Sequence, residues 1–124
     1  MSWLAVGAGA ACGAWLRWWL GIWFNSVNPH LPLGTLAANI GGGFLIGIAV
    51  AYFTDHAWLP PEWRLFAVTG FLGGLTTFST FSAEAMMLLQ RGDYAWALGH
   101  TLLHLAGSIL FCIAGFAAYR ALAA

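Results

Sequence analysis

The sequence contains very little charge. Only 6% of its 124 residues are Asp, Glu, Lys or Arg, whereas a soluble domain has about a quarter. The four basic residues are all arginines and are balanced by four acids, so no basic patch for nucleic acid is present. Because 61% of the residues are hydrophobic, this composition indicates an integral membrane protein. The length suits one domain, residues 1–124.

Cysteines and catalytic motifs are also scarce. The two cysteines, Cys12 and Cys112, both lie in apolar segments, so we expect small packing residues rather than a disulfide. There is no phosphate-binding loop, no cluster of His, Cys and acids at metal-ligand spacing, and no nucleophile with a base at motif spacing. The sequence therefore predicts a protein that is not an enzyme.

Four apolar segments are long enough to cross a membrane, since a helical span needs ~20 residues. Prolines break the first two links between these segments, and a short polar turn forms the third. Tryptophans and tyrosines gather at the segment ends, as in an interfacial belt. We therefore predict an all-α membrane protein with four transmembrane helices, at about residues 3–23, 33–53, 63–89 and 94–119.

The third segment is unusually long. As one helix its ~27 residues would measure ~40 Å, more than the ~30 Å of a hydrocarbon core. Gly73 and Gly74 lie near its middle, beside Thr76, and glycine weakens a helix. We predict a helix that is broken at mid-membrane, where free carbonyls and amides can hold ions. An intact, tilted helix with back-bonding hydroxyls is the alternative.

Small residues recur at intervals of four, which lets helix backbones approach closely. Gly43 and Gly47 form such a stripe in the second segment, and Ser108 and Cys112 in the fourth. A stripe in the first segment contains Ala5, Gly9, Gly13, Arg17 and Gly21. These stripes fit packing within one bundle and packing between subunits equally well. Four short helices enclose little space, so a solute path between subunits is the more natural arrangement.

A mixed aromatic and hydroxyl face follows the glycine pair. Phe78 and Phe81 are three residues apart and share a helix face, which Ser79 and Ser82 adjoin. The edge of an aromatic ring is electropositive, so ring edges and hydroxyl donors together suit an anion. An aromatic pair at this spacing is also typical of simple helix packing.

Five further polar residues of the predicted spans are candidates for a function. Asn39 offers an amide that can donate to an anion or clamp two helices. Glu84 is a functional candidate because ionisable groups are costly in a membrane. His104 and Ser108 are four residues apart and form a second polar stripe, in which the histidine either bonds a neighbouring helix or serves a pathway. Arg17 lies near the end of its span, where snorkelling to the interface is expected.

The arginines give no preferred orientation in the membrane. Arg64 and Arg120 lie on the side of the amino terminus, and Arg17 and Arg91 lie on the other. Orientation follows the imbalance of basic residues, and here there is none. Either the chain inserts in both directions and assembles as an antiparallel pair, or other cues decide its insertion.

The segment Gly73-Gly74-Leu75-Thr76-Thr77-Phe78-Ser79-Thr80-Phe81-Ser82 resembles the signature of the CrcB, or Fluc, family of fluoride channels. The similarity covers all four spans in order. It extends to Gly13, Ala14, Arg17, Gly34, Thr35, Asn39, Gly42, Phe44, Gly47, Gly107 and Ser108. Three residues before Gly107, where many members carry asparagine, this chain has His104.

The resemblance implies a passive channel that exports cytoplasmic fluoride. It implies an antiparallel, dual-topology homodimer with two pores at the subunit interface, in the plasma membrane and specifically a bacterial inner membrane. It places Arg17 near the pore entrance and a structural sodium ion on the backbone carbonyls of Gly73 and Thr76. The implied fluoride pathway consists of Asn39, Phe78, Phe81, Ser79, Ser82, Glu84, His104 and Ser108. His104 is included although many relatives carry asparagine at this position.

A coupled four-span transporter that exchanges small solutes for protons is the alternative function. Exchangers that resemble the small multidrug family need an acid in the first span, and residues 3–23 contain none.

Overall fold

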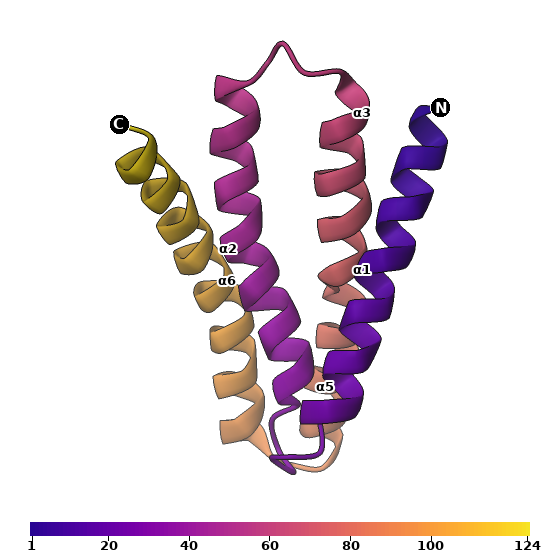
Figure 1. The fold of residues 1–124 in the computed structure, drawn as a ribbon. Helices are drawn as coiled ribbons and strands as arrows, with labels where there is room; N and C mark the ends of the chain where they lie inside the picture. Colours follow the sequence, from indigo (N-terminus) through magenta and orange to yellow (C-terminus); the bar gives the residue numbers. More distant parts are fainter.

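The computed structural model describes residues 1–124 and contains helices but no strands. Two long helices, one composite segment and a last long helix follow one another along the chain (Figure 1). Their bounds are α1 Ser2–Phe24, α2 Leu33–Asp55, α3 Pro61–Arg64, the π-helix η1 Leu65–Leu72, α4 Gly73–Leu75, α5 Phe78–Gln90 and α6 Tyr94–Ala123. Both termini lie at the same end of the molecule, as an even number of alternating helical segments requires (Figure 1).

Three helical segments are long and apolar enough to cross a membrane: Leu33–Asp55, Pro61–Gln90 and Tyr94–Ala123. The protein is therefore a multi-pass membrane protein. The 23-residue α1 has the length of a span but is not one of the three. It carries Arg17 and a group of tryptophans that are typical of an interfacial belt rather than of the apolar middle of a bilayer. Together with the three spans, α1 gives four helical segments in the predicted order.

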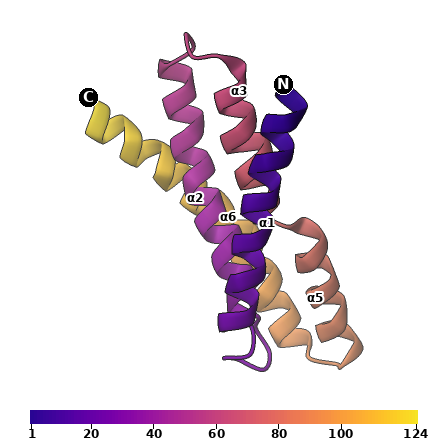
Figure 2. The same ribbon diagram turned by 45° about the vertical axis from the view of Figure 1, so that its right-hand side comes forward.

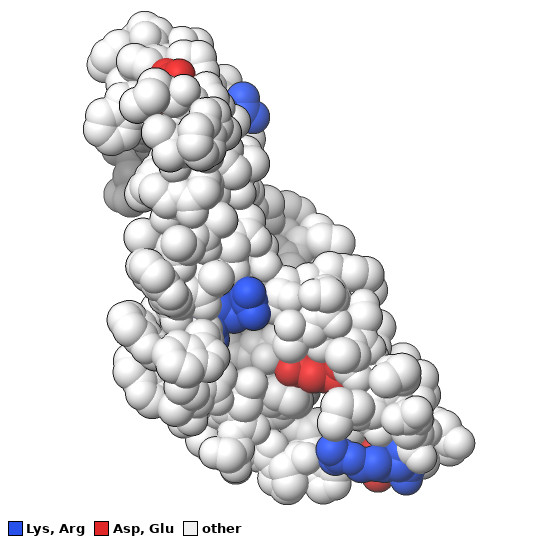
Figure 3. Space-filling model, turned by 90° about the vertical axis from the view of Figure 1, so that its right-hand side faces the viewer, with Lys and Arg blue, Asp and Glu red and all other residues white.

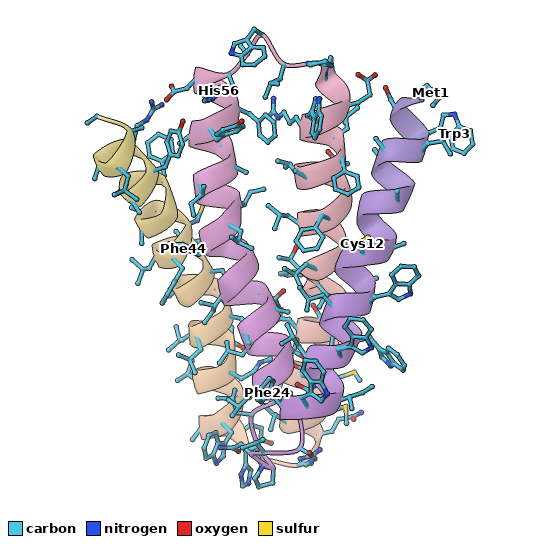
Figure 4. The ribbon with its side chains drawn as sticks, viewed as in Figure 1. Met1, Trp3, Cys12, Phe24, Phe44 and His56 are labelled. Carbon is cyan, nitrogen blue, oxygen red and sulfur yellow. The ribbon has the colours of Figure 1, made fainter.

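Much of the apolar surface is uncovered within a single chain. Trp3 is 75% exposed and points away from the neighbouring helices (Figure 4), and large apolar side chains on α6 are exposed along its length. Charged side chains form isolated patches on an otherwise uncharged face (Figure 3). Such a surface suits lipid and further protein subunits. Cys12 and Cys112 are free, as expected.

The glycine stripes pack helices of the same chain against one another. A Cβ placed at Gly47 of α2 would overlap the carbonyl oxygen of Cys112 on α6, and one at Gly43 would lie 2.8 Å from the Ser108 oxygen. On α1, a Cβ at Gly13 would overlap the carbonyl oxygen of Phe71 in η1. The stripes thus bring α2 onto α6 and α1 onto η1. For these glycines, packing within one bundle is the observed arrangement.

The third segment is broken, as predicted, and the intact tilted helix is excluded. Thr76 and Thr77 are extended, with φ and ψ of −85° and 153° and of −150° and 115°. The helix restarts as α5, and the Thr77 side chain caps it by accepting from the Thr80 N–H at 3.1 Å. Figure 2 shows α5 set apart from the line of α3, and α5 contacts α6.

The cause of the break differs from the prediction. Gly73 and Gly74 are helical residues of α4, and the chain leaves the helix at the two threonines that follow. A Cβ at Gly74 would overlap the carbonyl oxygen of Ala10 on α1. Gly74 therefore allows α1 to pack closely against α4. The low helix propensity of glycine does not explain where the helix breaks.

Candidate functional site

A groove of about 380 Å³ opens beside the break. Its walls come from α2, η1, α4, the break itself, α5 and α6, whereas α1 and α3 contribute no residue to them. Of the residues predicted to act, it is lined by Asn39, Gly73, Thr76, Phe78, Phe81, His104 and Ser108. Ser79, Ser82, Glu84 and Arg17 lie outside its lining.

The Asn39 amide occupies the place of a missing helical hydrogen-bond partner. Its Oδ1 accepts from the Thr77 N–H at 2.7 Å, and its Nδ2 donates to the Thr77 carbonyl at 3.1 Å. A break in a membrane helix leaves such backbone groups without partners, which is costly in lipid. The amide also approaches His104 Nδ1 at 3.0 Å. Asn39 therefore clamps α2 to the break and to α6 while it lines the groove.

Arg17 reaches the break from α1. Its Nε donates to the Gly74 carbonyl at 3.1 Å, across 57 residues of sequence. A cation near the carboxyl end of a helix is favourable because free carbonyls gather there, and Gly74 belongs to the last turn before the break. The Arg17 side chain is therefore tied to the backbone at the break through Nε, while the residue stays partly exposed.

Phe78 and Phe81 lie close together but in different surroundings. Their ring centroids are 5.3 Å apart, and both rings line the groove. Phe78 is 71% exposed, whereas Phe81 is 7% exposed. The Phe81 ring stacks on His100 at 5.2 Å and 5° between planes, and lies 5.0 Å from the His104 ring. Phe81 thus packs against the histidine rings behind the groove, whereas Phe78 projects away from the protein.

The hydroxyls of α5 are directed to the backbone or to each other. Ser82 donates to the Phe78 carbonyl at 2.9 Å, and Ser79 lies 3.3 Å from the Thr77 hydroxyl. Both serines are exposed. Ser108 differs, because it lines the groove from α6. Within one chain, Ser108 lines the same groove as the two phenylalanines. Ser79 and Ser82 lie outside this groove.

A buried polar chain continues from the groove toward the turn between α5 and α6. His104, beside Asn39, has its ring 4.4 Å from that of His100. His100 Nε2 lies 3.0 Å from Glu84 Oε1. The other carboxylate oxygen accepts from the Thr35 hydroxyl at 2.7 Å. Glu84 is therefore tied to both α2 and α6, although it lies outside the groove.

His100 was missed by the reasoning from sequence. It lies four residues before His104 on α6, so the two share a helix face, and this spacing is a signal the sequence does contain. The sequence contains no cluster of His, Cys and acids at metal-ligand spacing, but the fold brings three such residues together. One ligand atom each from Glu84, His100 and His104 lies within 4.8 Å of the others. The carboxylate comes from a different helix, and its distance along the sequence hides the group.

The proposed sodium ligands border open space. Gly73 and Thr76 both line the groove, and a Cβ at Gly73 would have no neighbour closer than 3.6 Å. The Thr76 hydroxyl donates back to the Leu72 carbonyl at 2.9 Å. The side chain of Thr76 is thus turned to its own helix, and the backbone is what this position offers to a ligand.

The family model described as "CrcB-like protein, Camphor Resistance (CrcB)" matches residues 4–116. The chain belongs to this family. It is 63% identical over 123 residues to the fluoride-specific ion channel FluC of Cupriavidus pinatubonensis, covering 99% of this chain and 98% of the relative. The protein of the same name from Cupriavidus metallidurans is 61% identical over the same shares. That from Pseudomonas putida is 55% identical over 118 residues, or 95% of this chain and 93% of the relative.

The CrcB match spans the whole groove. All of its lining residues, from Asn39 to Ile109, fall within the matched range 4–116. The Arg17 contact and the buried chain through Glu84 and His100 fall within it too. The features around the break therefore belong to the part of the chain that the CrcB family shares.

Proposed function

We propose that this CrcB-family protein is a fluoride-selective channel that lets cytoplasmic fluoride leave the cell passively, and that its membrane is a bacterial inner membrane. Its relatives at 55–63% identity are named fluoride-specific ion channels over nearly their full length. The observation that carries the proposal is the groove at the helix break. It combines an amide, two phenylalanines and a hydroxyl from Asn39, Phe78, Phe81 and Ser108.

The path lies between two subunits in this proposal. One chain encloses no channel, since its groove is open and Phe78 is 71% exposed. A second copy in the opposite orientation would cover this face, and the two-fold relation would generate two equivalent pores. The balanced arginines favour such an antiparallel homodimer, because neither orientation is preferred.

Fluoride would pass along ring edges and hydroxyl donors. An aromatic edge attracts an anion without the strong hold of a fixed cation, and conduction needs binding that allows exit. Phe78 and Phe81 would supply the edges, with Asn39 and Ser108 beside them. Ser79 and Ser82 lie on the exposed side of α5, where a partner subunit would bring them onto the path.

The flanks of the path carry the ionisable groups. Glu84 and His104 would border the inner part through the buried polar chain, and Arg17 would act near the pore entrance through its contact with the Gly74 carbonyl. A positive charge at this place would attract fluoride toward the break. Gly73 and Thr76 of both subunits would hold a structural sodium ion by their carbonyls.

Proton-coupled exchange of a small solute is the alternative function. The buried pair of Glu84 and His100, with oxygen and nitrogen 3.0 Å apart, is the observation that favours it, since a titratable pair inside a membrane can carry a proton. Against it, α1 contains no acidic residue. The absence of a nucleophile with a positioned base also argues against an enzyme.

Fluoride efflux from proteoliposomes separates these functions. Purified protein is reconstituted with internal fluoride, and a fluoride electrode follows release after an ionophore removes the membrane potential. We expect rapid release of fluoride, no release of chloride, and no need for a proton gradient. Release that requires an opposing proton gradient would identify an exchanger, and equal release of chloride would overturn fluoride selectivity.

A further inference from the structure

The buried cluster of Glu84, His100 and His104 has the composition of a transition-metal site. The two histidines are four residues apart on α6, and the carboxylate comes from α5. Their ligand atoms lie within 4.8 Å of one another. A helical histidine pair combined with a carboxylate from another position is a common way to bind zinc. This set is distinct from the carbonyls of Gly73 and Thr76, which as hard oxygen ligands suit sodium.

Two ring nitrogens in the cluster have no partner. His100 Nδ1 and His104 Nε2 are buried and make no hydrogen bond, and the two residues are 1% and 3% exposed. Buried polar atoms are nearly always satisfied by a hydrogen-bond partner, because leaving one unpaired destabilises the fold. Unpaired nitrogens in both histidines of the cluster call for an additional group between or beside the rings.

His100 and Glu84 already face each other. His100 Nε2 lies 3.0 Å from a Glu84 oxygen, so a cation seated between this nitrogen and this oxygen would be bound by both and would replace their hydrogen bond. The remaining Glu84 oxygen accepts from the Thr35 hydroxyl at 2.7 Å, which fixes the carboxylate. We propose that Glu84, His100 and His104 bind one first-row divalent cation such as Zn²⁺ in each chain.

A route to the cluster leads from the turn between α5 and α6. The side chain of Glu84 is 13% exposed, and it lines a small hollow of about 50 Å³ together with His30, Met87 and Arg91. A cation arriving there would meet the carboxylate first. The positive charge of Arg91 in the same hollow opposes its approach, so binding is slower than at an open site.

Metal binding competes with the Asn39 clamp. The amide orientation is set by its two hydrogen bonds to Thr77, so Nδ2 is the atom that donates to His104 Nδ1. That tautomer carries its proton on Nε2, and a metal needs a free lone pair. His104 must therefore give up either the Asn39 contact or a proton when it binds the cation. Occupation of the site would also take Glu84 and His104 away from the proposed fluoride path.

Cobalt titration tests the site without any measurement of transport. The full-length protein in detergent is stripped with a chelator and titrated with Co²⁺, whose visible absorption becomes intense in a four-coordinate protein site. We expect one Co²⁺ per chain, displaced by Zn²⁺. The variants Glu84→Gln, His100→Gln and His104→Gln should each weaken binding by at least about 100-fold, since even outer contacts to metal ligands are worth 10–100-fold.

His56→Gln is the matched control, because His56 caps the carboxyl end of α2, far along this helix from Thr35, which holds Glu84 near the amino end. Its Co²⁺ affinity should equal that of the unchanged protein. Each variant is used only if it elutes from size exclusion like the unchanged protein, and three variants guard against the failure of one to fold. Absence of saturable Co²⁺ binding, or equal binding by the folded cluster variants, would overturn the proposal. Neither result depends on whether the protein conducts fluoride.

Discussion

At the level of single residues, Asn39 connects the helix break with the groove. Its amide substitutes for a peptide group, because it offers one donor and one acceptor to the Thr77 backbone. The second amide hydrogen points at His104. Asn39 can therefore donate to a passing anion only by releasing one of these contacts. The amide would bind the anion only moderately, because the contact with His104 competes for the same hydrogen. Moderate binding fits a site through which ions pass.

Substitution of Asn39 separates its two roles. Asn39→Asp places a carboxylate oxygen against the Thr77 carbonyl and a negative charge in the groove, so fluoride efflux should be abolished. Asn39→Ser keeps a small hydroxyl donor and should retain part of the efflux. Both variants lose hydrogen bonds to the break and should unfold about 1–3 kcal/mol more easily. Efflux and thermal unfolding are measured on the same samples, and equal efflux by the two folded variants would rule out a role in the path.

The two phenylalanines should respond differently to replacement by isoleucine, which keeps bulk but removes the electropositive edge. Phe78→Ile should lower efflux with little effect on stability, because Phe78 is exposed. Phe81→Ile should also lower stability by about 0.5–1.5 kcal/mol, since it loses its stacking on His100. The double variant should be silent. Efflux and unfolding are measured beside Phe24→Ile, which lies outside the groove.

Normal efflux by the double variant would mean that the aromatic pair is packing only. Each subunit of the proposed dimer contributes to both pores, so partial efflux by the single variants fits the two rings serving different pores. Loss of efflux in Phe24→Ile as well would instead point to a general effect of removing an aromatic ring.

At the level of helices, the sequence predicts the break through its length and hides its cause. A segment longer than the bilayer indicates interruption, and the structure places it at Thr76 and Thr77. Asn39 and Arg17 bind the backbone groups that the break leaves without helical partners. These contacts span 38 and 57 residues of sequence. Such long-range pairs leave no periodic pattern in the sequence. The roles of Asn39 and Arg17 at the break could therefore not be assigned from the sequence alone.

The same limit explains the other misses at the site. His100 and His104 show their relation through helical spacing, but their grouping with Glu84 requires the packing of α5 on α6. The Ser82 hydroxyl adjoins the aromatic face in sequence and yet bonds the backbone of the preceding turn, as hydroxyls in helices often do. Periodicity locates a face of a helix, and only packing decides what covers that face.

Two alanine substitutions in α2 test the glycine contact with α6. Gly47→Ala would push a methyl group into the backbone of Cys112, so the variant should unfold about 1–3 kcal/mol more easily. Gly41→Ala, whose added methyl meets no atom within 4 Å in the chain, should be neutral or more stable by up to about 1 kcal/mol through helix propensity. Thermal unfolding in detergent measures both. Equal midpoints for the two variants would contradict close packing of α2 on α6.

At the level of the whole molecule, the arginine balance predicts that orientation is easily biased. Additional arginines at the carboxyl terminus should hold that end in the cytoplasm and leave no oppositely inserted partner. Fluoride resistance of cells should then fall, and co-expression of a copy biased the other way should restore it. A tail of glutamines of equal length is the control. Reporter fusions should place the unmodified carboxyl terminus on both sides of the membrane, and a single location would contradict the antiparallel assembly.

Sodium dependence is the remaining consequence of an antiparallel pair. The two breaks would meet at the two-fold axis, and Gly73 and Thr76 from both subunits would present carbonyls to one cation. Because the ion would bind the assembled dimer and not the unfolded chain, Na⁺ at 100 times its dissociation constant should stabilise the dimer by about 2.7 kcal/mol. Exchange of Na⁺ for a bulky organic cation should lower both the unfolding midpoint and fluoride efflux, and K⁺ should restore them poorly. Thr76→Val removes the hydroxyl that bonds Leu72 but keeps the carbonyl, so its sodium dependence should persist. Unfolding and efflux that are the same in every cation would show that the carbonyls hold water instead.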